Sequence, residues 1–380
     1  MVRRIIESSI LSKFYSDKAI IILGPRQSGK TTLARSIAEA SNQPALWLNG
    51  DEPDIRQRLS GISSDSLRQL FGNYKLVIID EAQRIKNIGI TLKLIIDNIP
   101  AVQVIATGSS SFELSGEINE PLTGRKYEYF LFPFSTSELI QFNGDMKETR
   151  LLPDRLVYGL YPEVVNNPGE EKNILKSIND SYLYKDIFSF QDLRKPELVE
   201  KLLQALALQI CSEVSYNELA HLLGVDPQTI EKYILLLERA FVVFRLPSLA
   251  RNIRNELKKS RKIYFIDNGI RNAIISNFQS FSLRTDSGVL WENYLVSERK
   301  KINHYYQRYC NTFFWRTTQQ QEIDYIEEES GMLHTFEFKL NKGGKKIPLT
   351  FAKSYPNFEF KIINMDNYLE FVNLKSGEHK

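Results

Sequence analysis

The stretch IIILGPRQSGKTT at residues 20–32 joins an apolar run to the pattern G-x-x-x-x-G-K-T. This order predicts a buried strand, a phosphate-binding loop and a helix that begins near Lys30. Glycines let backbone N–H groups turn towards phosphate oxygens, Lys30 can reach the β- and γ-phosphates of ATP, and the Thr31 hydroxyl can bind Mg²⁺. A glycine-rich turn without a ligand is the alternative. The predicted ATP-binding residues of the loop are Gly24, Pro25, Arg26, Gln27, Ser28, Gly29, Lys30, Thr31 and Thr32.

A second nucleotide signal is the segment KLVIIDEAQ at residues 75–83, an apolar strand that ends in two acids. Asp80 is expected to hold Mg²⁺ directly or through water, and Glu81 to polarise the attacking water. An acidic pair after an apolar strand is common by itself. Because it follows a phosphate-binding loop by about fifty residues, it supports the same prediction.

Further catalytic candidates come from the strands that follow. The apolar segment at residues 102–108 ends in small polar residues, so Thr107 and Ser109 are candidate contacts to the γ-phosphate or the water; a plain strand-end turn is the alternative. Arg125 is the candidate arginine that neutralises charge, in its own chain or at a neighbour's ATP. Arg84 is an alternative candidate for that role. The alternative without a catalytic role is that Arg125 forms an ion pair on the protein surface.

The chain is long enough for two or three domains, because it has 380 residues of which 42% are hydrophobic and 25% charged. Strands and helices alternate from Ile20 to about Phe134, which predicts an α/β domain with a parallel sheet. No apolar run has membrane-spanning length, and the amino terminus lacks the pattern of a signal peptide. We therefore expect a cytoplasmic protein without a membrane partner. Cys211 and Cys310 lack the spacing of a zinc site.

Residues 214–237 predict a helix-turn-helix, and residues 240–246 the strand of a wing. The positions expected to enter a DNA groove are Gln228, Thr229, Glu231 and Lys232. They hold a single base and include an acid, whereas major-groove readers bring Arg, Lys, Asn or Gln to base edges. This favours a winged helix used for packing, oligomer contact or non-specific phosphate contact over one that reads sequence.

Basic residues point to DNA as a partner. The net charge of +3 is mild, but the part of the chain from Pro247 onward carries about six more bases than acids. A basic run that could contact phosphates follows the predicted wing, and a solvated turn is the alternative interpretation. The run consists of Arg251, Arg254, Lys258, Lys259, Arg261 and Lys262.

The carboxy-terminal third contains a second set of chemical residues. Residues 321–326 and 333–339 predict two paired strands, with Glu337 and Lys339 on one face and Asp324 alongside. This is the D…E-x-K pattern of restriction-endonuclease-like nucleases, in which carboxylates hold Mg²⁺ or Mn²⁺ and the lysine activates water. Glu292 on a preceding helix could supply a further acid. The alternatives are a solvated charged hairpin and a nuclease-like fold without activity.

In order along the chain, GPRQSGKTTL, IIDEAQ, ATGSSS, LTGR, FPFSTSEL, GLYPE, YFIDNG, LWENY, EIDY and EFK resemble the bacterial and archaeal AAA-type ATPases whose carboxy-terminal region has no characterised function. The resemblance covers Ile20 to about Lys339. It implies Lys30, Thr31, Asp80 and Glu81 as ATPase residues. It further implies a winged helix followed by a restriction-endonuclease-like fold, with Glu292, Asp324, Glu337 and Lys339 as its site. Relatives of this type commonly form rings, so we expect a homo-oligomer, with a hexameric ring as one form.

These observations predict four domains. They are a P-loop ATPase domain at residues 1–136, a helical lid or linker at 137–206, a winged helix at 207–262 and a restriction-endonuclease-like α/β domain at 263–380. The predicted function is ATP binding and hydrolysis coupled to action on DNA, with nuclease activity of the last domain left open. The alternative is an ATP-dependent switch that acts on a protein partner without nucleic acid.

Overall fold

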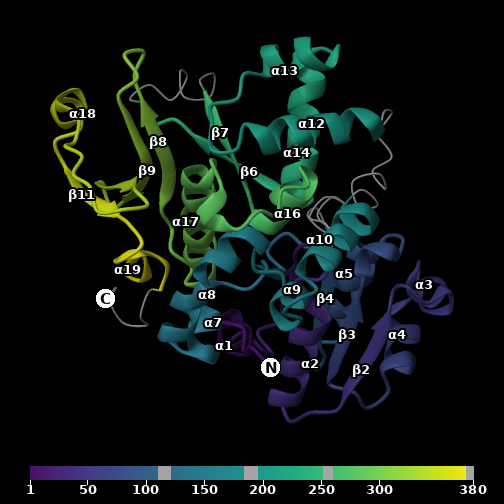
Figure 1. The fold of residues 1–380 in the computed structure, drawn as a ribbon. Coiled ribbons are helices and arrows are strands. Elements are labelled where there is room, and N and C mark those ends of the chain that lie inside the picture. The colour runs from purple at the N-terminus through teal and green to yellow at the C-terminus, as the bar shows by residue number, and fades with distance from the viewer. Residues whose placement is uncertain (110–120, 184–195, 251–259, 374–380) are drawn as a thin grey trace. The chain divides into compact units, whose positions relative to one another are not determined.

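A computed structural model describes residues 1–109, 121–183, 196–250 and 260–373. These residues form two compact units, and each is described by itself. The first is built mainly on Met1–Phe134, and the second on Ser135–Ser181, Arg194–Glu238 and Val242–Lys380. The predicted divisions at residues 206 and 262 both fall within the second unit and stay predictions. Figure 1 labels many of the helices and strands of both units.

The first unit contains a five-stranded parallel sheet in the order β2-β3-β4-β1-β5. Its elements are α1 (Ile6–Leu11), β1 (Ala19–Leu23), α2 (Lys30–Ala40), β2 (Ala45–Asn49), α3 (Pro53–Leu59), α4 (Ser64–Phe71), β3 (Leu76–Asp80), η1 (Ala82–Arg84), α5 (Ile88–Asn98), β4 (Gln103–Gly108) and β5 (Lys126–Phe130). Parallel neighbours need crossover connections, which explains why helices separate the first four strands. All these strands therefore end at one edge of the sheet.

Burial follows the position of each strand in the sheet. Every residue of β1 and β4 is buried, as expected for central parallel strands covered on both faces. The edge strand β2 instead exposes Trp47. Helix α2 buries Leu33 and Ala34 and, one turn later, Ile37 and Ala38, so its apolar face packs inward with helical spacing. The predicted parallel α/β fold is confirmed for this unit.

The second unit begins with helices and a short hairpin. Its elements to that point are α7 (Thr136–Asn143), α8 (Asp145–Tyr158), α9 (Pro162–Asn166), α10 (Glu171–Ser177), the π-helical η2 (Ile178–Leu183), α12 (Pro196–Leu208), α13 (Tyr216–Leu223), α14 (Pro227–Arg239), β6 (Val243–Pro247) and β7 (Arg261–Phe265). Gly224 ends α13 in the left-handed conformation at φ 68°, and Asp226 accepts a 2.7 Å bond from the Thr229 N–H to cap α14. Strands β6 and β7 pair antiparallel. This is the order of elements that the winged-helix prediction requires.

Buried polar side chains join this region to the next helices, α16 (Asn268–Ile274) and α17 (Ser287–Tyr305), which flank the short η3 (Phe281–Leu283). Asp267 accepts a 2.7 Å bond from the Leu160 N–H, and Asn293 donates to Asn268 Oδ1 at 2.7 Å. A Cβ on Gly159 would lie 2.0 Å from Asp267 Oδ1, so glycine is required there. The sequence motifs GLYPE, YFIDNG and LWENY are thus parts of one packed junction.

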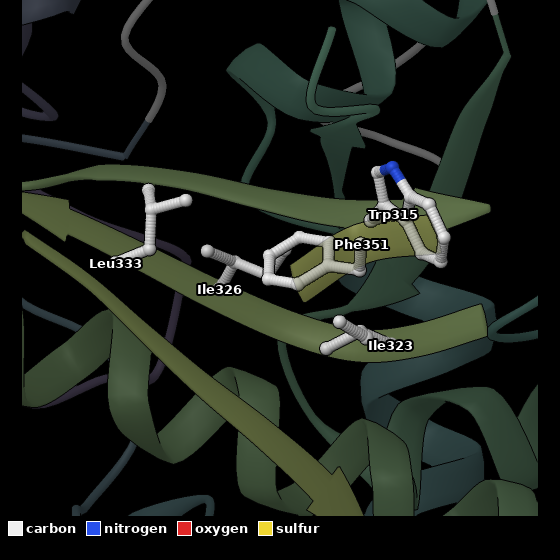
Figure 2. Close-up of a cluster of buried hydrophobic side chains, with 5 residues drawn as sticks. All are labelled: Trp315, Ile323, Ile326, Leu333 and Phe351. Atoms are coloured by element: carbon white, nitrogen blue, oxygen red, sulfur yellow. The ribbon is translucent and has the colours of Figure 1, made fainter. Parts of the chain in front are cut away.

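The second unit ends in a mixed sheet of order β11-β10-β9-β8. Strands β8, β9 and β10 pair antiparallel, and β11 runs parallel to β10. The elements are β8 (Asn311–Arg316), β9 (Glu322–Glu329), β10 (Met332–Phe338), α18 (Leu349–Ser354), β11 (Phe358–Ile363) and α19 (Tyr368–Val372). Figure 2 shows one core of this sheet, formed by Trp315, Ile323, Ile326, Leu333 and Phe351.

A buried ion cluster is centred on Glu327 of β9. Arg299 of α17 donates to both carboxylate oxygens, at 2.8 and 2.7 Å, and Asn303 adds a bond of 2.7 Å. Arg308 approaches within 3.3 Å. Burial acts to raise the pKa of Glu327, but the Arg299 guanidinium and the other donors outweigh it and lower the pKa to about 2.

This cluster makes the stability of the second unit depend on pH. The pKa of Glu327 is lower in the folded protein than in the unfolded chain, so its ionised form stabilises the fold at pH values above the unfolded pKa of about 4.5. This contribution is lost as the pH falls towards about 2. Glu327→Gln leaves Arg299 buried without its counterion and should reduce the free energy of unfolding at pH 7 by about 3–5 kcal/mol. Urea unfolding followed by tryptophan fluorescence measures it.

The matched control is Glu328→Gln, the next residue on β9. We expect a change within about 0.5 kcal/mol for this substitution, as for ordinary surface positions. The difference between the two variants should shrink at pH 3. Equal losses in both variants, or a difference that does not depend on pH, would contradict the role of Glu327.

Candidate functional site

The predicted phosphate loop lies between the end of β1 and the start of α2. Its backbone is closely packed, because a Cβ on Gly24 would lie 2.1 Å from the carbonyl oxygen of Leu131. Gln27 and Gly29 have φ values of 60° and 94°, in the left-handed region. Lys30 begins the helix, as predicted, and its buried Nζ donates to the carbonyl oxygens of Gly24 and Pro25, both at 2.9 Å. The ammonium group is therefore held within the loop.

A chain of hydrogen bonds crosses the carboxyl ends of three neighbouring strands. The Thr31 hydroxyl donates to Asp80 Oδ2 at 2.8 Å, and the Thr107 hydroxyl donates to Asp80 Oδ1. The Glu81 N–H donates to Thr107 Oγ1 at 3.2 Å. The structure thus brings together the predicted Mg²⁺ ligands, the predicted catalytic acid and one of the two predicted γ-phosphate contacts.

Gln83 connects Ser109, the other predicted γ-phosphate contact, to this chain of hydrogen bonds. Its Nε2 donates to Glu81 Oε2 at 2.5 Å and to Ser109 Oγ at 2.9 Å. Glu81 has a φ of 50°, which makes a tight turn after the end of β3. A Cβ on Gly50 would lie 2.4 Å from the Glu81 carbonyl oxygen, so the turn is also fixed from β2. Gln83 belongs to the DEAQ segment, but no role for it was predicted from the sequence.

Arg125 lies at the opposite edge of the sheet. In the parallel register, Ala19 is level with Lys126 and Leu23 with Phe130. Arg125 is therefore beside the start of β1, at least ~13 Å from the loop at about 3.3 Å per residue. It pairs with Asp97 at 2.7 Å, while Arg84 pairs with Asp51 at 3.5 Å. Arg125 does not reach the ATP site of its own chain, and its action at a neighbour's site stays a prediction.

The second predicted site gathers carboxylates and lysines in the second unit. Tyr325 of β9 is opposite Phe336 of β10, so the adjacent residues Asp324 and Glu337 follow side by side. Lys339 Nζ lies 2.8 Å from Glu337 Oε1, and Lys345 Nζ lies 2.7 Å from the same oxygen. Lys345 is a partner of Glu337 that was not predicted from the sequence.

Glu292 of α17 is held by two residues of β7. Lys262 Nζ lies 3.0 Å from its Oε1, and the Tyr264 hydroxyl donates to the same oxygen at 2.7 Å. Lys262 also pairs with Glu322 at 2.6 Å, and its side chain is only 4% exposed. The prediction that Lys262 contacts DNA phosphates is therefore wrong, because its ammonium group is buried and paired with two acids inside the protein. Residues Arg251, Arg254, Lys258 and Lys259 of the same basic run lie outside the described residues.

Asp324 has the most perturbed environment of these acids. Burial raises its pKa to about 7, with a further increase from the nearby charges of Glu292 and Glu337. Its Oδ2 accepts a 2.8 Å bond from the Phe338 N–H. The buried Oε2 of Glu337 has no hydrogen-bond partner among the residues that the structure describes. Negative charge is thus incompletely balanced here.

These acids do not form a ready set of metal ligands. Within the described ranges, no group of three or more His, Cys, Asp or Glu residues is arranged to hold a metal ion. Lysines contact Oε1 of Glu337 and Oε1 of Glu292, two of the carboxylate oxygens that the prediction assigned to Mg²⁺ or Mn²⁺. The metal-binding roles of Glu292, Asp324 and Glu337 stay predictions, as does the catalytic role of Lys339.

Arg261 and other described bases of the second unit are also paired internally. Arg261 contacts Glu231 at 3.7 Å and lies over the Tyr216 ring. Further pairs join Arg271 and Arg284 to Asp286, Lys301 to Glu298, Arg316 to Glu213, and Lys342 to Asp366. A count of basic residues alone thus overstates the number that are available to contact DNA. Separately, none of the described helices has the length and hydropathy needed to cross a membrane.

Comparison with known proteins identifies the first unit. Residues 16–140 match the model of an AAA domain family. Residues 149–280 and 287–364 match two domains of unknown function, DUF8612 and DUF4143. A Walker-type ATPase of Pyrococcus abyssi has a similar structure, with a TM-score of 0.50 and 16% identity over 72% of this chain and 96% of that one. This likeness supports the fold.

Relatives with similar sequences include two uncharacterised proteins. An uncharacterised protein of Mycobacterium tuberculosis is 27% identical over 84% of this chain and 70% of its own length. An uncharacterised protein of Methanocaldococcus jannaschii is 24% identical over 98% of this chain and 84% of its own length.

The AAA-domain match and the phosphate-loop geometry together define the first unit as a P-loop AAA-type ATPase domain. This class was predicted from the sequence and is confirmed. The winged-helix and endonuclease-like interpretations of the second unit stay predictions, because the families matched there carry no assigned function.

Proposed function

We propose that this protein binds ATP with Mg²⁺ and hydrolyses it in the first unit. The observation that carries the proposal is the hydrogen-bonded chain from Thr31 through Asp80 and Thr107 to Glu81. It joins a hydroxyl and a carboxylate, both oxygen ligands suited to Mg²⁺, to a second carboxylate one residue further on. Thr31 and Asp80 are the residues that would hold Mg²⁺, which when bound neutralises charge on the β- and γ-phosphate oxygens.

In this mechanism Glu81 accepts a proton from the water that attacks the γ-phosphorus. The bond from the γ-phosphorus to the bridging oxygen breaks, and its electron pair leaves with ADP. Lys30 binds the phosphates after exchanging the carbonyl oxygens of Gly24 and Pro25 for phosphate oxygens. Gln83 orients the Glu81 carboxylate through its amide and fixes Ser109 at the same time.

Separate variants should divide binding from hydrolysis. Lys30→Ala should abolish ATP binding, because the loop loses the charge that reaches the phosphates. Glu81→Gln should keep ATP affinity within about threefold but lower the rate of turnover by about 10²–10⁴, the usual contribution of a general base. Phosphate release and nucleotide titration measure the two effects. The control is Glu52→Gln, which replaces an exposed acid of the same unit. Normal turnover by Glu81→Gln would remove Glu81 as the base.

We propose further that the second unit couples this ATPase to DNA. Support comes from the helix-turn-helix of α13 and α14, the antiparallel hairpin of β6 and β7, and the basic residues of the sequence between those strands. Because the described bases are largely paired with acids, the DNA contact is assigned to the run at Arg251, Arg254, Lys258 and Lys259. Contacts of this kind recognise phosphates without reading sequence.

A protein-directed switch is the second candidate function. The internal pairing of Lys262, Arg261, Arg271 and Arg316 favours it, since these bases stabilise the second unit without a nucleic acid. In this case ATP would control binding of a protein partner. The two functions differ in their response to DNA and to salt.

ATP turnover with and without single-stranded, duplex and branched DNA distinguishes these functions. DNA coupling predicts stimulation of about tenfold, equivalent to about 1.4 kcal/mol off the barrier. Replacing Arg251, Arg254, Lys258 and Lys259 with Gln should remove it. The control replaces three exposed lysines, Lys346, Lys353 and Lys361, and should keep it. Affinity for DNA should also fall steeply as salt increases. Turnover that no DNA stimulates would favour the switch.

We also propose a more specific function for the second unit, which is metal-dependent cleavage of DNA. Asp324 and Glu337 are the residues that would hold a divalent cation, because they lie side by side on paired strands and the buried Oε2 of Glu337 has no hydrogen-bond partner among the described residues. Glu292 fits less well while Lys262 and Tyr264 hold it. A bound Mg²⁺ or Mn²⁺ would supply Lewis-acid chemistry at a phosphate. Lys339 would orient the water from its position beside Glu337.

A nicking assay on supercoiled DNA with Mg²⁺ or Mn²⁺ tests this proposal. Glu337→Ala combined with Lys339→Ala should eliminate nicking, because both the metal ligand and the water-orienting lysine are removed. Lys342→Ala removes an exposed lysine of the same loop that pairs with Asp366, and should leave nicking unchanged. Nicking that survives in the double variant would place the activity at another site or in a contaminant.

A further inference from the structure

Arg4, in the segment before α1, contacts the phosphate loop directly. Its Nη1 donates to the carbonyl oxygen of Ser28 at 2.8 Å, and its Nη2 donates to the carbonyl oxygen of Phe132 at 2.6 Å. The guanidinium also lies 5.1 Å from the centre of the Phe134 ring. The residue is only 7% exposed. One planar group therefore joins the amino-terminal segment, the phosphate loop and the chain after β5.

The bond to Ser28 constrains the next peptide group. In a trans peptide the C=O and the following N–H point in opposite directions. Arg4 holds the Ser28 carbonyl on its own side, so the N–H of Gly29 is directed to the other side of the loop. Gly29 has a φ of 94° and starts α2, where backbone N–H groups of a phosphate loop meet the anion. Arg4 thus contacts the Ser28–Gly29 peptide at the start of α2.

We propose that Arg4 is a positioning residue for the phosphate loop and sets its affinity for the phosphates of ATP. The proposal rests on the proposed ATP-binding function. Arginine is required because its rigid fork reaches two carbonyl oxygens at once while its face lies over an aromatic ring. A lysine presents a point charge on a flexible stem and cannot hold the two carbonyls in the same geometry. Arg4 acts through the backbone and does not touch the reacting atoms.

The sequence neighbour Arg3 provides a matched control. Its side chain is 73% exposed and forms an ion pair with Glu7 at 3.2 Å. Replacing Arg3 with Gln removes the same charge from the same segment without changing the contact to Ser28. A difference between the two positions therefore reports the loop contact and excludes a general effect of charge.

The experiment measures ATP affinity in a Glu81→Gln background, where turnover does not disturb the titration. Full-length Arg4→Lys, Arg4→Met and Arg3→Gln variants are titrated with a fluorescent ATP analogue. We expect both Arg4 variants to raise the Kd by about tenfold or more, equivalent to ~1.4 kcal/mol. Arg3→Gln should stay within about twofold. With Glu81 intact, Arg4→Lys should raise KM by a similar factor and change kcat at saturating ATP by less than about twofold.

The outcomes separate this proposal from the proposed function. Failure of the parent protein to bind ATP would defeat the ATPase proposal itself. If the parent binds ATP and Arg4→Lys, with a parental circular dichroism spectrum, binds as tightly as Arg3→Gln, the role of Arg4 is overturned while the ATPase stands. A fall in kcat with no change in KM would also overturn it. Should Arg4→Met fail to fold, Arg4→Lys, which keeps the charge and stem, still decides the question.

Discussion

Parallel pairing of β1, β4 and β3 is the constraint on which the ATP site depends. Because the three strands run in the same direction, their carboxyl ends meet at one edge and bring Thr31, Asp80 and Thr107 within hydrogen-bond distance. The loop then packs against the chain after β5, where Leu131 leaves no room for a side chain at Gly24. A change in strand direction or order would separate these groups, although each local sequence motif stayed the same.

Local sequence predicted the parts of this site that neighbours along the chain determine. The strand, loop and helix from Ile20 onward follow from an apolar run, two glycines and a helix start at Lys30, and the structure places them as expected. Arg4 could not be found in this way, because its partners Ser28 and Phe132 are 24 and 128 positions away in the chain. The distance of Arg125 from its own ATP site likewise follows from the direction of β5.

The second unit shows where charge counting fails. The sequence predicted that Asp324, Glu337 and Lys339 come together, since strand pairing and alternation determine that contact. It did not predict Lys262 among the acids, because a lysine in a basic run resembles a surface residue until its strand is seen beside α17 and β9. Many of the described bases after Pro247 form ion pairs with acids, several of them buried. A basic residue in this sequence therefore serves the packing of the unit as often as it offers a charge for binding.

The ion pairs of Lys262 link the strand β7 to the carboxylate site, two features that lie apart in the sequence. Lys262 belongs to β7, which follows the basic run, and its ammonium group bridges Glu292 and Glu322 at the carboxylate site. Burial alone would lower the pKa of this lysine, but the two acids reverse that effect and raise it, so the lysine stays charged. Loss of the Lys262 charge would leave Glu292 and Asp324 facing each other with less compensation. The hairpin strand thus contributes electrostatically to the carboxylate site. A ligand that displaced β7 would alter the charge balance at Asp324 without touching it.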